Sequence, residues 1–193
     1  MDKTIMIGLG GTGLEAIRFL RRRVVEAHGR LAKLPQLGFL YIDTDGGGVA
    51  ITEDNRKRWE ILGVPVALDE SEYQILDTPE VGGIVDNLDQ FPHISNWFPA
   101  AQLRTIDQSA KDTPGARQIR PLGRLAFTLK TAEVEKKFKN LLNRLPQASG
   151  GGKTQVYLVC SLSGGTGSGI FLDLAYRIRE WTAGNCETSA FLG

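Results

Sequence analysis

Glycine and small hydroxyl residues gather in the stretch SLSGGTGSGIF, residues 161–171, directly after the apolar run VYLVC. Apolar residues then recur at helical spacing, so the stretch marks a strand that becomes a helix. The first four N–H groups of a helix lack partners within it, and the aligned peptide dipoles place about half a positive charge there. Glycine lets the backbone come within hydrogen-bonding distance of a phosphate oxygen, because a Cβ would occupy that space. The stretch therefore predicts a phosphate-binding turn.

A second turn of the same kind, GLGGTG at residues 8–13, follows the strand-like segment KTIMI. Alone, it would indicate a dinucleotide site with Asp43 or Asp45 holding a ribose, or glycines that serve only tight strand-to-helix packing. A nicotinamide-binding domain needs one phosphate loop, whereas this chain has two such turns. Two turns on one ligand indicate a longer polyphosphate.

The candidate phosphate-binding residues are the glycines and hydroxyl residues of both turns. In the first turn they are Gly10, Gly11, Thr12 and Gly13. In the second turn they are Ser163, Gly164, Gly165, Thr166, Gly167 and Ser168. The hydroxyls of Ser161 and of this second group can donate to phosphate oxygens, although Thr166 or Ser168 can instead cap the following helix.

Acids and arginines complete the candidate site. Asp43 and Asp45 end the apolar run LGFLYIDTD, residues 37–45, and a turn with Asx bonding is the alternative for both. The segment GARQIRPLGR, residues 115–124, precedes a long helical pattern. Its arginines are Arg117, Arg120 and Arg124. An arginine there can pair with phosphate, or it can belong to a solvated helix start or pair with a local acid.

Other site chemistries lack support in the sequence. The segment GGGKT, residues 150–154, resembles the end of a P-loop, but Gln147 stands where that motif requires glycine, and the segment precedes a strand. We interpret it as a flexible connector. The two histidines have no metal-ligand spacing, and the two cysteines are typical of a reduced chain.

Alternating strand and helix patterns position these residues. The predicted strands are 3–10, 37–45, 154–160 and 187–193, with VPVALD, 64–69, as a further candidate. The predicted helices are 14–27, a long one from Pro121 to Pro146, and 169–181. About 30 residues separate the first two strand starts, which is the size of a βαβ unit. We therefore predict an α/β fold: a Rossmann-like, open, mostly parallel sheet with helices on both faces.

Composition argues for an ordinary globular domain, with 41% hydrophobic and 23% charged residues. A net charge of +1 gives no field that favours nucleic acid or an anionic membrane as partner. We interpret RRR, residues 21–23, as the wet face of the first helix. No apolar stretch approaches the roughly 20 residues that span a bilayer, and no signal peptide precedes the first strand. We expect a cytoplasmic protein without membrane insertion.

The second turn, SGGTGSG, resembles the signature loop GGGTG[ST]G of tubulin and of the bacterial division GTPase FtsZ. FtsZ-like chains also open with a strand and a GxGGxG turn, and their second strand ends in an acidic turn, which DTD at residues 43–45 resembles. The segment at 115–124 stands where the family has a third phosphate-facing loop, but its arginines replace a neutral, glycine-rich sequence. In this respect the chain is more similar to the bacterial tubulin-like proteins than to FtsZ itself.

The resemblance implies GTP or GDP with Mg²⁺ as the ligand, held by the two glycine turns from opposite sides. It also implies that Asp45 lies near the magnesium, through water. The resemblance further implies a cytoskeletal GTPase whose full chain associates head to tail into filaments. The family's base-binding elements and water-activating acid fall outside residues 1–193. We therefore expect an N-terminal nucleotide-binding domain, truncated from a longer chain and without hydrolysis of its own, and we assign no catalytic residue.

Two other functions stay open. An NAD(P)- or FAD-binding Rossmann oxidoreductase domain would use Gly8, Gly10, Gly13 and Asp43, but it leaves the second turn without a role. A nucleotide-free scaffold would keep the fold for assembly alone. Bulky replacements of Gly165 and Gly167 that leave assembly unchanged would favour the scaffold.

Overall fold

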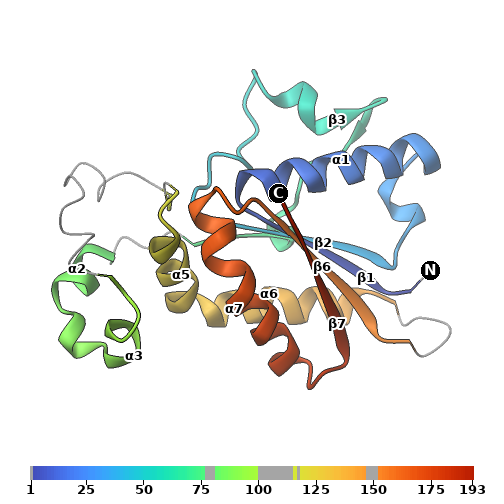
Figure 1. Cartoon of the computed structure of the whole chain (residues 1–193). Coiled ribbons are helices and arrows are strands. Elements are labelled where there is room, and N and C mark those ends of the chain that lie inside the picture. Colours follow the sequence, from blue (N-terminus) through green and yellow to red (C-terminus); the bar gives the residue numbers. More distant parts are fainter. Residues whose placement is uncertain (1, 77–80, 100–114, 117, 147–151) are drawn as a thin grey trace.

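In the computed structural model, which describes residues 2–76, 81–99, 115–116, 118–146 and 152–193, five strands form one sheet in the order β5, β2, β1, β6, β7 (Figure 1). The strands of this sheet are β1 (Thr4–Leu9), β2 (Leu37–Asp43), β5 (Tyr73–Ile75), β6 (Thr154–Cys160) and β7 (Cys186–Leu192). All four pairings are parallel, which confirms the predicted fold class.

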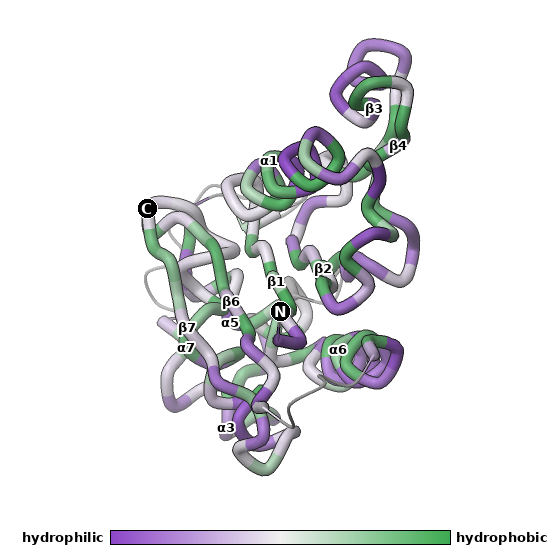
Figure 2. Tube along the Cα trace, turned by 90° about the vertical axis from the view of Figure 1, so that its right-hand side faces the viewer, coloured by the Kyte–Doolittle hydropathy of each residue, from purple (hydrophilic) through white to green (hydrophobic). Residues whose placement is uncertain are grey.

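Helices cover both faces of the sheet. The helices of eight or more residues are α1 (Gly10–His28), α5 (Arg120–Leu129), α6 (Thr131–Arg144) and α7 (Gly165–Trp181). The shorter helices are α2 (Val81–Asp86) and α3 (Pro92–Ser95), with 3-10 turns at Leu31–Lys33, Arg56–Trp59, Glu70–Glu72 and Leu88–Gln90. Figure 2 shows α1 on one side of strands β1, β2 and β6, and α6 and α7 on the other.

The alternation of strand side chains creates two core layers. Ile5, Ile7 and Leu9 of β1 point into the layer that α6 and α7 close. Met6 points the other way, into a layer that it shares with Ile17 of α1. A third, smaller cluster packs the region of α2 and α3 against α5.

The predicted strand at 64–69 is wrong as a member of the sheet. Only Val64–Pro65 (β4) is extended and paired, and its partner is β3 (Glu60–Ile61) in a separate antiparallel hairpin. Leu62 and Gly63 turn that hairpin with positive φ angles, so the chain folds back locally before it reaches the sheet. The strand that pairs with β2 on the side away from β1 is the three-residue β5, which is too short to show alternation.

The predicted single helix from Pro121 to Pro146 is two helices. Lys130 leaves the helical conformation, with φ −111° and ψ 19°, between α5 and α6. The Thr131 hydroxyl donates to the carbonyl oxygen of Phe127 at 2.7 Å, a bond that competes with the regular ladder and bends helices. Apolar spacing continues across the break, which explains why the sequence pattern indicates one element.

The interpretation of RRR as a solvated face is wrong for its first member. Arg21 is 4% exposed, whereas Arg22 and Arg23 are exposed and pair with Glu26. The described part of the chain contains no helix long and apolar enough to cross a membrane.

Candidate functional site

The three central strands end at one edge of the sheet. Leu9, the last residue of β1, lies opposite Ile42 of β2 and Cys160 of β6 in the parallel register. The glycine turns after β1 and β6 therefore emerge side by side, with the acidic turn after β2 next to them (Figure 1). Chain order also reverses at β1, because β2 and β5 lie on one side of it and β6 and β7 on the other. Ligands of open α/β sheets bind at this position.

The two glycine turns contact each other. Gly10 has a φ of +69°, and a Cβ built on it would lie 3.6 Å from both the Gly167 nitrogen and the Thr166 Cβ. From the other side, a Cβ on Gly167 would lie 3.1 Å from the Leu9 carbonyl oxygen. The starts of α1 and α7 thus form one continuous backbone surface, as the predicted shared site requires.

Close packing explains three of the candidate glycines. A Cβ on Gly13 would lie 2.4 Å from the Gly8 carbonyl carbon, and one on Gly167 would lie 2.6 Å from the Cys160 Cβ. A Cβ on Gly165 would lie 2.7 Å from the carbonyl oxygen of Ala116. These distances are shorter than a van der Waals contact, so the fold requires glycine here whether or not a ligand binds.

Gly11 and Gly164 have no such explanation. No described residue places an atom within 4 Å of the Cβ position of either glycine. Neither has a positive φ angle, and Gly164 has a φ of −82°. Among the described residues, nothing fills the space in front of the starts of α1 and α7, where packing and backbone conformation alone would accept a larger residue.

Both helix starts present uncompensated backbone donors. Among the described residues, no side chain caps α1 at its N-cap Leu9 or α7 at its N-cap Gly164. Neither first turn contains an acid that would balance the positive end of the helix dipole. This donor set suits an anion with several oxygens.

The hydroxyl residues of the turns divide into two groups. Thr12 and Ser163 are exposed at the open side, and the Ser163 hydroxyl lies 2.8 Å from that of Ser161. Ser168 donates to the Gly164 carbonyl oxygen, and Thr166 is buried with its hydroxyl turned toward β2. Neither Thr166 nor Ser168 caps α7, which was the alternative for both.

The two acids occupy different environments. Asp45 is exposed, and its Oδ1 accepts from the Gly47 N–H at 2.9 Å, which is the Asx bonding that the sequence left open. Asp43 is 8% exposed. Its Oδ1 accepts from the Thr44 N–H at 2.7 Å and from the Thr166 hydroxyl at 2.9 Å. Asp43 is thus committed to protein donors, whereas Asp45 presents its carboxylate to solvent.

Tyr41 supplies the donor to the remaining oxygen of Asp43. The Tyr41 hydroxyl donates to Asp43 Oδ2 at 2.5 Å. Burial, followed by the charge of the neighbouring Asp43 carboxylate, raises the pKa of Tyr41 well above its ordinary value. The phenol therefore stays protonated and keeps donating at all physiological pH values.

The arginines of the third segment have different surroundings. Arg117 lies outside the described residues. Arg120 is exposed and donates to the Leu162 carbonyl oxygen at 2.9 Å, so its guanidinium lies beside the second glycine turn. Arg124 instead pairs with Asp173 at 2.6 Å and lies 4.4 Å from the centre of the Trp97 ring. Arg124 thus follows the alternative of pairing with a local acid.

Metal-binding capacity at the site is limited to hard oxygen ligands. The described ranges hold no group of three or more His, Cys, Asp and Glu residues that could bind an ion. Mg²⁺ needs few protein ligands, since it keeps several waters and takes other oxygens from phosphate. The exposed carboxylate of Asp45 beside the two turns fits such an ion.

Sequence reasoning missed Thr44 and Ala116. Thr44 is 7% exposed, and its Oγ1 accepts from the Ala116 N–H at 2.8 Å and lies 2.7 Å from Thr166 Oγ1. A threonine between two acids in DTD was the available signal, although a buried hydroxyl there cannot be recognised without the partner segments.

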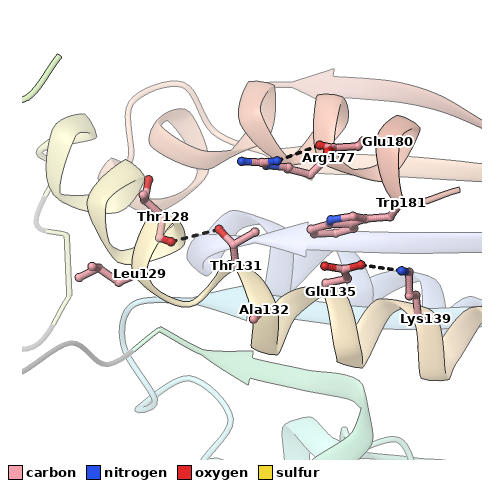
Figure 3. A pocket seen from close by; sticks show the side chains of 9 residues that line it. All are labelled: Thr128, Leu129, Thr131, Ala132, Glu135, Lys139, Arg177, Glu180 and Trp181. Atoms are coloured by element: carbon pink, nitrogen blue, oxygen red, sulfur yellow. Dashed lines mark hydrogen bonds and ion pairs between the residues drawn. The ribbon is translucent and has the colours of Figure 1, made fainter. Parts of the chain in front are cut away.

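A separate cavity of about 580 Å³ lies between α6 and the carboxyl end of α7 (Figure 3). Its lining residues are Thr128, Leu129, Thr131, Ala132, Glu135, Lys139, Arg177, Glu180 and Trp181. The ion pairs Glu135–Lys139 and Arg177–Glu180 flank the Trp181 ring. This cavity is at the opposite end of α7 from Gly165 and is not part of the candidate site.

Comparison with known proteins agrees with this architecture. A family model described as "Tubulin like" matches residues 5–192. Among solved structures, CetZ from Methanosaeta thermophila strain DSM 6194 is similar in fold, with a TM-score of 0.55 and 12% sequence identity. The match covers 100% of this chain and 37% of that chain, so this chain spans little more than a third of the CetZ length. No curated protein sequence matches the chain. Because the family model covers nearly the whole sequence, the chain belongs to the tubulin-like family.

Proposed function

We propose that the chain binds GTP or GDP, with the phosphates between the starts of α1 and α7. One observation carries the proposal: no described residue fills the space in front of Gly11 and Gly164 or caps the two helix starts, which touch each other. Packing accounts for glycine at other positions of the turns and does not account for these two. Family membership supports GTP as the nucleotide.

Each turn has a role in the proposal. The backbone N–H groups of Gly10, Gly11, Thr12 and Gly13 would hold the phosphates from one side. Those of Ser163, Gly164, Gly165, Thr166, Gly167 and Ser168 would hold them from the other, with the exposed hydroxyl of Ser163 as a further donor. Arg120 would add positive charge beside the second turn, and Asp45 would hold Mg²⁺ through water. Asp43 would act indirectly, because protein donors occupy its carboxylate.

The proposal extends to a longer protein. A bacterial, cytoplasmic cytoskeletal role, with head-to-tail self-association and GTP hydrolysis in the assembled form, is what the tubulin-like family suggests. In this proposal the described residues would hold the phosphates. We assign no catalytic residue, because hydrolysis also requires a positioned water.

The oxidoreductase alternative is disfavoured by Asp43. In a dinucleotide domain an acid at the end of the second strand binds the ribose hydroxyls. Here that carboxylate is 8% exposed and already accepts from Tyr41, Thr44 and Thr166. Its release would leave three buried donors without a partner, each at a cost of about 1–3 kcal/mol.

A nucleotide titration followed by amide NMR tests the proposal and detects weak binding as well as tight. GTP with Mg²⁺ is expected to shift the amide signals of Gly11 and Gly164, whereas NAD⁺ at the same concentration leaves them in place. Shifts with NAD⁺ that GTP does not reverse would establish the dinucleotide alternative. The absence of any shift with GTP, GDP, ATP or NAD⁺ would favour the nucleotide-free scaffold.

A further inference from the structure

A buried chain of hydrogen bonds joins three segments of the site. It runs from the Ala116 N–H to Thr44 Oγ1 at 2.8 Å, on to Thr166 Oγ1 at 2.7 Å, and to Asp43 Oδ1 at 2.9 Å. The four residues are between 3% and 8% exposed. They come from the segment before α5, the end of β2 and the first turn of α7. The hydrogen bonds therefore connect residues that lie more than 70 positions apart in the sequence.

The chemistry of the end groups fixes the direction of every bond. A backbone N–H can only donate, so Thr44 accepts from Ala116. An ionised carboxylate can only accept, so Thr166 spends its one hydroxyl proton on Asp43. The proton between the two threonines must therefore come from Thr44. Each threonine hydroxyl accepts one hydrogen bond and donates one, so the loss of either hydroxyl breaks the series of bonds at a defined place.

Thr44 is the link that the other groups cannot replace. The Asp43 carboxylate is held independently by Tyr41 and by the Thr44 N–H, and Thr166 is held by Asp43. Ala116 is held to this cluster through Thr44 Oγ1. The carbonyl oxygen of Ala116, in turn, packs against Gly165, where an added Cβ would lie only 2.7 Å away. The Thr44 hydroxyl thus fixes the segment before α5 against the start of α7.

We propose that Thr44 is a positioning residue for the phosphate-binding turn at the start of α7. Its hydroxyl aligns this turn with the segment Gly115–Ala116 and does not touch the ligand. The expected effect on GTP binding rests on the proposed function. The expected effect on Ala116 rests on the hydrogen bonds alone. Removal of the hydroxyl is expected to loosen Ala116 and weaken GTP binding together. A buried N–H without its acceptor costs about 1–3 kcal/mol, which corresponds to roughly tenfold or more in an equilibrium.

The test compares Thr44→Val, which keeps the shape and removes the hydroxyl, with Thr44→Ser, which keeps the hydroxyl. In the 193-residue chain, amide exchange of Ala116 and the GTP dissociation constant are measured by NMR. Thr44→Val is expected to speed Ala116 exchange and weaken GTP binding, each about tenfold. Thr44→Ser is expected to restore both values to within about threefold of the original. The exchange of the Leu158 amide in β6 reports global unfolding and is expected to change less than that of Ala116.

A second variant keeps the test decisive where Thr44→Val folds poorly. Thr166→Val removes the hydrogen bonds from Thr166 to Thr44 and Asp43 and leaves the Ala116–Thr44 hydrogen bond in place. It is expected to weaken GTP binding while Ala116 exchange stays near its original rate.

The outcomes separate the inference from the proposed function. If the unmodified chain binds no GTP, the proposed function fails, and Ala116 exchange still tests the hydrogen-bond chain. If GTP binds the unmodified chain and Thr44→Val with equal affinity, the positioning role is overturned and the proposed function stands. Unchanged Ala116 exchange in Thr44→Val would overturn the inference as well.

Discussion

Individual glycines of the two turns serve different physical purposes. Gly13, Gly165 and Gly167 lie where a Cβ would overlap backbone or side-chain atoms, so they are requirements of the fold. No described residue fills the space in front of Gly11 and Gly164. The sequence alone suggested bulky substitutions at Gly165 and Gly167 as a way to tell a nucleotide-binding protein from a scaffold. Such substitutions would damage packing in either protein, so they cannot separate the two. Substitutions at Gly11 and Gly164 can separate the two functions.

The Tyr41–Asp43 contact predicts a stability change at high pH. The folded pKa of Tyr41 lies above the value of about 10 in the unfolded chain, so the folded state keeps a proton that the unfolded state loses. The contribution of protonated Tyr41 to the free energy of unfolding is fully present below pH about 10. It declines as pH rises further, by up to about 1.4 kcal/mol per pH unit. Tyr41→Phe is expected to remove this decline and, at pH 8, to lower the free energy of unfolding by about 1–3 kcal/mol.

Urea denaturation between pH 8 and pH 11 checks this prediction. Tyr176→Phe is the matched control, because Tyr176 is 65% exposed and its removal should leave the pH dependence unchanged. Identical pH profiles for the original chain and Tyr41→Phe would show that Tyr41 does not titrate differently in the folded state.

Between elements, an ion pair ties α1 to the segment before β5. Arg21 Nη1 pairs with Glu72 Oε2 at 2.8 Å, and Nη2 donates to the Ala67 carbonyl oxygen at 2.9 Å. Glu72 also accepts from the Asp69 N–H, in a capping box at the start of the 3-10 turn. Arg21 thus contacts the segment between β4 and β5 at two points, Ala67 and Glu72.

Removal of one partner of this pair is expected to be costly. Arg21→Met leaves the Glu72 carboxylate, whose side chain is 13% exposed, without its cation, and the loss of a hydrogen bond to a charged group costs about 1.5–3 kcal/mol. Arg22→Met, the exposed neighbour, should change the free energy of unfolding by less than about 0.5 kcal/mol. Urea denaturation of the two variants measures the difference. Equal small losses in both would mean that the Arg21 pair contributes no more than a surface ion pair.

The elements were predictable where a pattern was local. Strands β1, β2, β6 and β7 and helices α1 and α7 follow from apolar spacing and from the glycine turns between them. The break at Lys130 was not predictable, because apolar residues keep their spacing across it. Helical spacing from Leu14 and Ile17 places Arg21, and not Arg22, on the buried face of α1. Its burial was missed because the partner that allows it, Glu72, lies 51 positions away.

On the scale of the whole molecule, the sheet order brings distant segments to one edge. The sequence could indicate two phosphate-binding turns, since each ends a strand and begins a helix. That the turns meet follows from the adjacency of β1 and β6, which needed the tertiary fold. The role of Thr44 depends on Ala116, 72 positions later, and no spacing rule connects the two.

The central claim is that both turns hold one ligand. Its most direct test is an acidic substitution in the first turn whose effect is measured at the second turn. Gly11→Asp would place a negative charge in the open space, while Gly11→Asn adds the same shape without charge. Because an acid in the first turn stabilises a helix by about 0.3–1 kcal/mol, Gly11→Asp should remain folded. The measurement is the GTP-induced NMR shift of the Gly164 and Gly165 amides. We predict that Gly11→Asn weakens this shift, because its side chain fills part of the space in front of the turn, and that Gly11→Asp abolishes it, because the added charge also repels phosphate. If the Gly164 and Gly165 amides report the same GTP affinity in both variants, the phosphate site is not shared between the two turns.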